Sequence, residues 1–272
     1  MALLASLPMY DLEPLRPATD AWWSGVAAAL RRQGFEDAPG SLMRDGGFAD
    51  RFVQWASPDL LLSQTCGYPL THDFARHLRL VATPVYRAAH CAGPRYCSVA
   101  VVRDDSPAVT IGDLRGGHVA FNSEDSQSGF NSLRALVAPL ARDGRFFCKA
   151  TETGRHAASI AMVAAGRADV CTIDCVSHAL WCASEPELVA GTRVLTVTGR
   201  APSLPYVTHA RRSDREVERL QAALAEAVAD PTLKAAREAL LIEGFETLPR
   251  AAYDEIDAME DLAIAAGYPA LA

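Results

Sequence analysis

The chain has 272 residues, half of them hydrophobic, and a formal net charge of −7 at pH 7. A chain of this length and composition can bury one large core or two smaller ones, which excludes fibrous and disordered proteins. The acidic balance argues against proteins that hold nucleic acid or an anionic membrane on a broad basic face. A small anion can still be held by local dipoles whatever the global charge.

The first residues, "MALLASLPMYDLEP", favour a strand over a leader sequence. They lack both a basic segment and a small-residue cleavage site after a long apolar core. No stretch approaches the roughly 18 uninterrupted apolar residues that span a bilayer. We therefore expect a strand from Ala2 to Pro8, no membrane insertion and a cytoplasmic protein, or a periplasmic one if a leader has been removed. Seven cysteines without paired spacing also favour a reducing compartment.

Strand-like apolar runs recur along the chain and alternate with helix-like segments through most of it. The runs begin at Ala2, Asp59, Leu78, Tyr96, His118, Ala168 and Thr192. Strands that alternate with helices predict an α/β fold with a largely parallel sheet. In the first expected helix, Trp22 and Leu30 share one face as core residues. Thr19 or Asp20 would cap this helix, and Gly34 would end it.

After the strand near Thr192 the alternation stops. A proline-rich stretch, "GRAPSLPYVTHARRSD", leads into an Ala- and Glu-rich segment from Asp214 to Ala266 that we expect to be helical. A chain that alternates, breaks at such a crossing and finishes in helices fits two lobes, with the tail returning to the first. We place residues 1–98 plus 201–272 in lobe 1 and residues 99–200 in lobe 2.

The stretch "FNSEDSQSGFNSLRAL", which begins at Phe121, gathers hydrogen-bonding groups between a strand and a helix. Ser126, Gln127, Ser128 and Gly129 fall at the helix N-terminus, where the first backbone N–H groups lack intrahelical acceptors and the dipole is positive. The serines would donate hydroxyl hydrogen bonds to an anion, and Gly129 would let it approach the backbone. Alternatively, one serine merely caps the helix. The segment matches neither a P-loop nor a G-x-S-x-G motif.

Asp174 ends the strand-like run "ADVCTID" and would point to the sheet edge where open α/β sheets bind ligands. Its carboxylate could accept the P–OH of a phosphorus oxyanion whose second pKa is near ~6, and so select that anion over sulfate. Alternatively, Asp174 caps the helix that follows. Asp174, His178 and Cys182 share a helical face, but without Cys-x-x-Cys pairing we expect no metal.

Five segments occur in the order seen in the substrate-binding proteins of phosphate, phosphite and phosphonate ABC transporters, and nearly the whole chain resembles that family. They are "LPMYD" at Leu7, "YCSVAVVRDDSP" at Tyr96, "DLRGGHVAFNSEDSQSG" at Asp113, "TGRHAASIAMVAAGRADVCTID" at Thr153 and "PSLPYV" at Pro202. The resemblance implies an α/β, two-lobed periplasmic-binding-protein-like (type II) fold with a two-strand hinge. It also implies a ligand held in the cleft between the lobes, and we expect no cofactor.

The resemblance implies that several residues contact the ligand. The family's Ser/Thr-Ser-Gly turn at a helix start maps onto Ser126, Gln127 and Ser128, with Gln127 in place of the more usual threonine. The longer amide changes the pocket, so the ligand can differ from those of typical members. The family's tyrosine before the hinge strand matches Tyr96, and a residue that ends the first strand matches Tyr10.

A second turn of the family, TG-x-H, maps onto Thr153, Gly154 and His156. The family commonly has a histidine near the ligand at this place, which makes His156 a ligand-binding candidate. Alternatively, His156 is a first-turn helix residue that faces water, because a short motif match can arise by chance.

These observations predict a receptor with no catalytic residue for a small phosphorus oxyanion or organophosphonate, such as phosphate, phosphite or a phosphonate. Its partners would be that ligand and, if the protein is exported, an ABC permease. The alternative is a cytosolic enzyme on the same fold, comparable to menaquinone-pathway lyases or thiamine-pyrimidine synthases, that acts on a small anionic metabolite. Such an enzyme would need Asp174 or His156 as its base, and fold alone does not separate the two classes.

Overall fold

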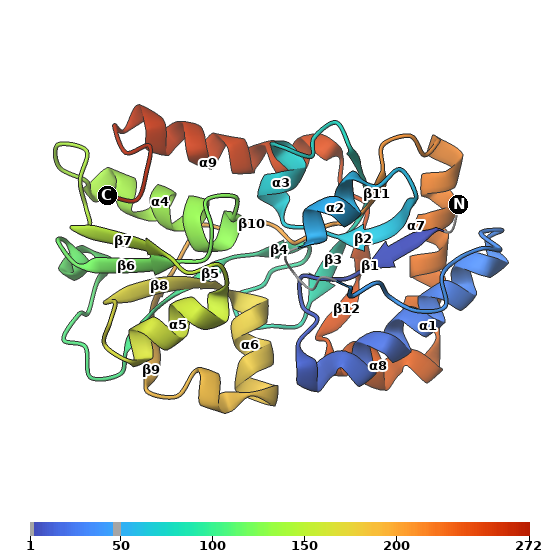
Figure 1. Cartoon of the computed structure of the whole chain (residues 1–272), viewed down its shortest axis with the longest axis horizontal. Helices are drawn as coiled ribbons and strands as arrows, with labels where there is room; N and C mark the ends of the chain where they lie inside the picture. Colours follow the sequence, from blue (N-terminus) through green and yellow to red (C-terminus); the bar gives the residue numbers. More distant parts are fainter. Residues whose placement is uncertain (1–2, 46–49) are drawn as a thin grey trace. The chain divides into compact units, whose positions relative to one another are not determined.

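The computed structural model describes residues 3–45 and 50–272, which form two compact units (Figure 1). Unit 1 takes the described part of residues 1–87, then 92–94 and 202–252, and unit 2 takes 88–91, 95–201 and 253–272. Ala2, where the first strand was expected to begin, lies outside the described residues. Within the described chain, no helix is both long enough and apolar enough to cross a membrane.

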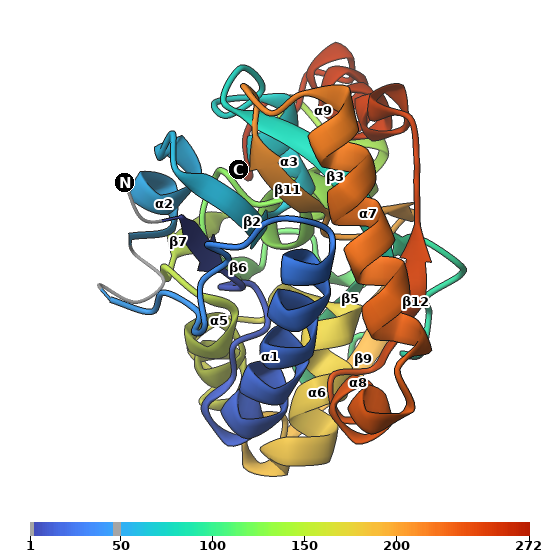
Figure 2. The same ribbon diagram turned by 90° about the vertical axis from the view of Figure 1, so that its right-hand side faces the viewer.

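Unit 1 is built on a five-stranded mixed sheet. In sheet order its strands are β1 (Leu4–Ser6), β2 (Leu60–Gln64), β11 (Tyr206–His209), β3 (Leu78–Tyr86) and β12 (Ile242–Glu246). β1 and β2 are parallel, whereas β11 is antiparallel to β2 and β3, and β12 is antiparallel to β3. The helical segments are η1 (Glu13–Leu15), α1 (Arg16–Arg32), α2 (Arg51–Ala56), α3 (Gly67–Thr71), α7 (Asp214–Ala229), η7 (Pro231–Leu233) and α8 (Lys234–Ala239), and η8 (Arg250–Tyr253) spans the last passage into unit 2. Figure 2 shows α1 and α7 packed side by side.

Helix α1 illustrates how local sequence and packing agree. Trp22 and Leu30 are fully buried, as their spacing predicts. The expected cap was wrong, because η1 leads directly into α1 at Arg16 and proline is tolerated in the first turn of a helix. The hydroxyl of Thr19 donates instead to the Leu15 carbonyl (3.2 Å). Gly34 follows the helix end with φ +83°, a conformation that favours glycine.

The expectation of an all-helical tail was wrong at β12. This strand pairs with β3, with Phe245 opposite Pro84 and Glu246 opposite Thr83. Leu241, with φ +57°, turns the chain out of the α8 path immediately before the strand. The pairing joins segments that are far apart in the sequence, so the helical composition of the tail did not reveal it.

Unit 2 has its own five-stranded sheet. In sheet order its strands are β7 (Lys149–Glu152), β6 (His118–Phe121), β8 (Val170–Asp174), β5 (Ser98–Arg103) and β9 (Thr192–Val197). β6 is parallel to β7 and β8, whereas β5 is antiparallel to β8 and β9. The helical segments are η3 (Ile111–Leu114), η4 (Gln127–Asn131), α4 (Ser132–Val137), η5 (Ala138–Leu140), α5 (His156–Ala164), α6 (Cys175–Ser184), η6 (Pro186–Leu188) and α9 (Asp254–Ala265). A two-stranded sheet of β4 (Arg95–Tyr96) and β10 (Ala201–Pro202) marks two of the places where the chain passes between units.

The last helix corrects the predicted division of the chain. We had placed all of 201–272 in lobe 1, but residues 253–272 belong to unit 2. Figure 1 shows α9 running beside α4. The buried side chains of Ala263, Tyr268 and Leu271 enter the core around the unit 2 sheet. The buried guanidinium of Arg134 on α4 also contacts Glu260 on α9 (2.9 Å), so apolar burial and an ion pair together hold the tail there.

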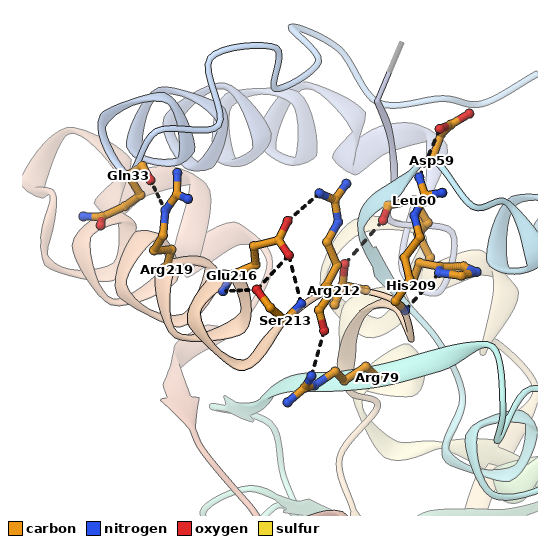
Figure 3. A network of polar contacts seen from close by, with 11 residues as sticks. Gln33, Asp59, Leu60, Arg79, His209, Arg212, Ser213, Glu216 and Arg219 are labelled. Carbon is orange, nitrogen blue, oxygen red and sulfur yellow. Dashed lines mark hydrogen bonds and ion pairs between the residues drawn. The ribbon is translucent and has the colours of Figure 1, made fainter. Parts of the chain in front are cut away.

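The start of α7 in unit 1 is closed by a reciprocal cap (Figure 3). The Ser213 hydroxyl accepts from the Glu216 N–H (3.3 Å), and the Glu216 carboxylate accepts from the Ser213 N–H (2.8 Å). Arg212 donates to the other carboxylate oxygen (2.8 Å), and its carbonyl accepts from Arg79 (2.7 Å). Burial alone would raise the pKa of Glu216, but the hydrogen bonds from Arg212 and Ser213 outweigh it and lower that pKa to about 2.

We expect Glu216→Gln to lower the free energy of unfolding near pH 7 by about 1–3 kcal/mol, because hydrogen bonds to a charged group are lost. The folded-state pKa lies below the unfolded value of about 4.3, so the stabilisation is complete above that value and is lost as pH falls toward 2. Urea denaturation at pH 7 and pH 3 measures the difference. Glu218→Gln, on the exposed side of the same helix, is the control. Equal losses of unfolding free energy in both variants would contradict this role of Glu216. So would a difference between wild type and Glu216→Gln that does not shrink at pH 3.

Candidate ligand-binding site

Three loops of unit 2 meet at one edge of its sheet. Because β6 runs parallel to β7 and β8, the carboxyl ends of the three strands lie at the same edge. Asn122 follows β6, His156 begins α5 after β7, and Asp174 ends β8. The Gly154 N–H donates to the Asn122 carbonyl (2.8 Å), which ties the loop after β7 to the loop after β6. The topology therefore gathers polar side chains that are dispersed in the sequence.

The turn at 126–129 begins with a capping serine. The Ser126 hydroxyl accepts from the Gly129 N–H (3.0 Å), so the capping alternative is what the structure shows for this residue. As an acceptor in that bond, the hydroxyl keeps its own hydrogen for donation. The Ser126 carbonyl accepts from Asn131 N–H (3.0 Å), five residues on, which makes η4 a single π turn. Such widened turns are frequent at functional sites.

Ser128 and His156 contact each other across the two loops. The Ser128 Oγ lies 2.9 Å from His156 Nε2. Burial lowers the pKa of His156 to about 4, so the ring is neutral at pH 7. Its Nδ1 is shielded from solvent and has no hydrogen-bond partner among the described residues. The ring therefore faces the serine turn and does not point only to water.

Gly129 allows the turn to lie against its neighbours. A Cβ at this position would stand 1.7 Å from Asn122 Oδ1 and 3.1 Å from His156 Cε1. The Asn122 Oδ1 is buried without a hydrogen-bond partner among the residues that the structure describes. We had not identified Asn122 from the sequence, although its place directly after a strand and within a polar run was a signal. The Gly129 backbone, the Asn122 amide and the His156 imidazole therefore lie close together.

We expect Gly129→Ala to destabilise the protein by about 1–3 kcal/mol, the usual cost of overpacking, because Asn122 or the turn must move. Gly112→Ala is the matched control in unit 2, since its added Cβ would meet the nearest atom, Thr110 Oγ1, at an ordinary 3.5 Å. Thermal denaturation of both variants provides the comparison. A Gly129→Ala protein as stable as the Gly112→Ala control would show that this close approach is unnecessary.

Gln127 is buried and contacts the C-terminal helix α9. Its Nε2 lies 3.2 Å from Met259 Sδ on α9, and its Oε1 accepts from Asn131 Nδ2 (2.7 Å). Asn131 also donates to the Ile256 carbonyl on α9 (2.9 Å). These contacts make Gln127 part of the packing that holds the turn against α9.

Asp174 is buried and caps α6. Its Oδ1 accepts from the N–H groups of Val176 (2.7 Å) and Ser177 (3.0 Å), as the capping alternative predicted. Ser98 pairs with Asp174 in the β5–β8 register, and the Ser98 hydroxyl contacts that of Ser132 (3.1 Å).

Ser132 completes a chain of hydroxyl groups toward the turn. Its Oγ donates to the Ser128 carbonyl (2.9 Å). Sequence reasoning missed both Ser98 and Ser132. The four-residue spacing from Ser128 to Ser132 on a helix-like run was the available signal for the second.

The two tyrosine candidates belong to different units. Tyr96 is a buried residue of β4 in unit 2. Tyr10 is a buried residue of unit 1, where its ring meets Tyr86 edge-on at 5.4 Å between centroids. The Tyr86 hydroxyl accepts from Gln64 Nε2 (2.8 Å) at the end of β2. The structure therefore brings His156 together with the 126–129 turn, sets Asp174 at the same sheet edge, and places Tyr10 in the other unit.

Charged side chains and metal ligands contribute little to this edge. Arg95 forms a two-point ion pair with Glu255, with one contact at 2.9 Å. Arg155, ahead of α5, is exposed. In residues 3–45 and 50–272, no group of three or more His, Cys, Asp or Glu side chains could hold a metal ion. The turn and its neighbours His156 and Asn122 are thus neutral hydrogen-bonding groups, with the Asp174 carboxylate at the same sheet edge.

Two α/β units, each on a five-stranded sheet and joined by several chain passages, define the periplasmic-binding-protein class, and solved structures share this fold. PA3383 from Pseudomonas aeruginosa, a binding-protein component of an ABC phosphonate transporter, aligns with TM-score 0.76 and 16% identity over 97% of this chain and 87% of its own. PhnD1 from Prochlorococcus marinus in complex with methylphosphonate aligns with TM-score 0.72 and 16% identity over 96% of this chain and 97% of its own. XAC2383 from Xanthomonas citri bound to ATP aligns with TM-score 0.72 and 14% identity over 98% of each chain. At these identities the likeness shows the fold alone.

The family follows from the sequence profile. A family model described as "ABC transporter, phosphonate, periplasmic substrate-binding protein" matches residues 57–253. This match covers more than half of the chain, which therefore belongs to the family of phosphonate ABC transporter substrate-binding proteins. Comparison with curated protein sequences gives no significant match. The predicted family, two-lobed α/β fold class and solute-binding role are confirmed. The expectation of a largely parallel sheet was wrong, because β11, β12 and β5 pair antiparallel with their neighbours.

Proposed function

We propose that unit 2 binds the phosphorus oxyanion of a small organophosphonate at the turn of Ser126, Gln127 and Ser128, beside His156 and Asp174. The observation that carries this proposal is the convergence of the Ser128–His156 contact with Gly129, where a side chain would collide with Asn122. A glycine in such a place is needed where a backbone must be approached closely. The family to which the chain belongs supports a receptor over the enzyme alternative.

The chemistry of the turn suits an anion. A neutral His156 can donate its Nε2 hydrogen to Ser128 Oγ, which directs the serine's own hydrogen outward. The start of a helix adds backbone N–H groups and a positive dipole. Hydrogen bonds from neutral groups to a charged oxygen are among the stronger ones in proteins. A phosphonate would therefore be held by positioned dipoles and not by an arginine clamp.

Methylphosphonate is the reference ligand, because PhnD1 was solved in complex with it. We propose that the protein acts in the periplasm and delivers its ligand to an ABC permease, as the family's description supports. This placement is the second of the two expected from the sequence, which were a cytoplasmic protein or a periplasmic one if a leader has been removed. Tyr96 and Tyr10 are proposed to contribute to ligand binding as in the family.

We expect Ser128→Ala to weaken methylphosphonate binding by about 1.5–3 kcal/mol, or roughly 10- to 150-fold, because a hydrogen bond to a charged oxygen is lost. Isothermal titration calorimetry measures the change, and a melting curve without ligand reports any effect on folding. Ser184→Ala, at the far end of α6 where the hydroxyl bonds only to the Leu180 carbonyl among the described residues, is the control. Unchanged affinity in a folded Ser128→Ala protein would remove the turn from the site.

We expect Asp174→Asn to reduce the preference for phosphate over sulfate. Asparagine also caps helices, so α6 should remain folded. In the wild type, affinity should fall as pH rises through the second pKa of phosphate, near ~6 to 7, because the carboxylate then faces a doubly charged anion. The amide can donate as well as accept, which should flatten this profile and strengthen sulfate binding.

Calorimetry with phosphate and sulfate between pH 5.5 and 8.5 tests the carboxylate's role. The capping contact alone predicts a small stability change with ligand preference unaltered. An Asp174→Asn protein that keeps the wild-type pH profile and still rejects sulfate would rule out the acceptor role.

A further inference from the structure

Three cysteines that the proposed function does not use lie together in unit 2. The Sγ atoms of Cys91 and Cys175 are 3.6 Å apart. The Cys175 N–H donates to the Cys97 carbonyl (3.0 Å), which places the third cysteine beside them. Cys91 is partly exposed, whereas Cys97 and Cys175 are buried. The sequence separation of Cys91 and Cys175 is 84 residues, so no spacing pattern pointed to this pair.

The two sulfur atoms are in non-bonded contact. A disulfide holds its sulfur atoms about 2.05 Å apart, so an approach of roughly 1.5 Å would join them. Side-chain rotation supplies movements of that size without a change of fold. We propose that Cys91 and Cys175 form a reversible disulfide that fastens residues 88–91 to the first residue of α6.

The reaction requires an oxidant, which would be a low-molecular-weight disulfide. The partly exposed Cys91 attacks one sulfur of that disulfide as its thiolate, and the other sulfur leaves as a thiolate. Cys175 then loses its proton, and its sulfur attacks Cys91 Sγ and expels the second thiolate. Two protein thiols are oxidised by two electrons. The reagent disulfide is reduced to two thiols, which take up the two protons.

Solvent accessibility and the positions of the sulfur atoms favour a disulfide between Cys91 and Cys175 over one that includes Cys97. Cys97 is buried, and its Sγ lies near the His90 carbonyl (3.9 Å). Contact with Cys91 and burial raise the pKa of Cys175 by more than contact with the Cys97 thiol lowers it, so Cys175 is not the first thiol to react with a reagent. An oxidant therefore meets Cys91 first, and Cys175 is the thiol in sulfur contact with it.

The bond would reinforce a segment where the chain enters unit 2. His90 has φ +72°, and its carbonyl also accepts from Arg200 Nε (3.1 Å). Fastening this segment to α6 closes a long loop of chain, which reduces the freedom of the unfolded state. Cys175 follows Asp174 directly, so the fastened residue neighbours the cap of α6. The proposal does not depend on which ligand the protein binds.

The test uses the full-length protein, first reduced and then exposed to oxidised glutathione. Thiols are counted after denaturation, and cross-linked peptides are identified by mass spectrometry under non-reducing conditions. We expect two of the seven thiols to be lost without a glutathione adduct, adducts on exposed cysteines being counted separately by mass, together with a peptide pair joining Cys91 to Cys175 and a higher melting temperature that dithiothreitol reverses. Cys91→Ser should abolish all three changes, and Cys148→Ser, at an exposed cysteine, should abolish none.

Three results would overturn the proposal. One is a full complement of free thiols after oxidation. Another is a cross-link of Cys175 to Cys97, and the third is a glutathione adduct that stays on Cys91 without closing. Because Cys91 is partly exposed, Cys91→Ser should fold even if Cys175→Ser does not, so the comparison does not depend on a substitution in the core.

Discussion

The parallel pairing of β6 with β7 and β8 is the constraint on which the candidate site depends. It places Asn122, His156 and Asp174 at the ends of three neighbouring strands, although about fifty residues of sequence separate the first from the last. Each strand is followed by a helix, so helix starts and strand ends meet at the same edge. A hydroxyl turn at one of these starts becomes a binding site only because the neighbouring loops supply its partners.

The polar groups at this edge are unequally satisfied. Ser126 and Asp174 cap their helices and so contribute to folding. Asn122 Oδ1 and His156 Nδ1 are shielded without partners among the described residues, and burying such atoms costs free energy. Proteins commonly accept this cost where function requires it. The capping contacts stabilise the same loops and help to offset the cost.

The C-terminal helix supports the turn from its other side. Gln127 and Asn131 of the π turn contact Met259 and Ile256 of α9. The buried Arg134–Glu260 ion pair fixes α9 on α4 a little further along. A charge buried in this way is stable only with its partner in place, so removing either side chain of the pair would be costly. Helix α9 therefore supports the turn, although the sequence analysis assigned this helix to the other lobe.

The sequence by itself determined the α/β class, the buried face of α1, the strand-turn-helix at Phe121 and the motifs of the family. These features depend on short-range periodicity, capping and motif spacing, which the chain displays locally. Only the tertiary structure decided that β12 pairs with β3, that α9 joins unit 2, that Asn122 lies against Gly129, and that Cys91 meets Cys175. Each of these depends on contacts between segments far apart in the chain. Their free energy comes from burial and pairing that no local pattern encodes.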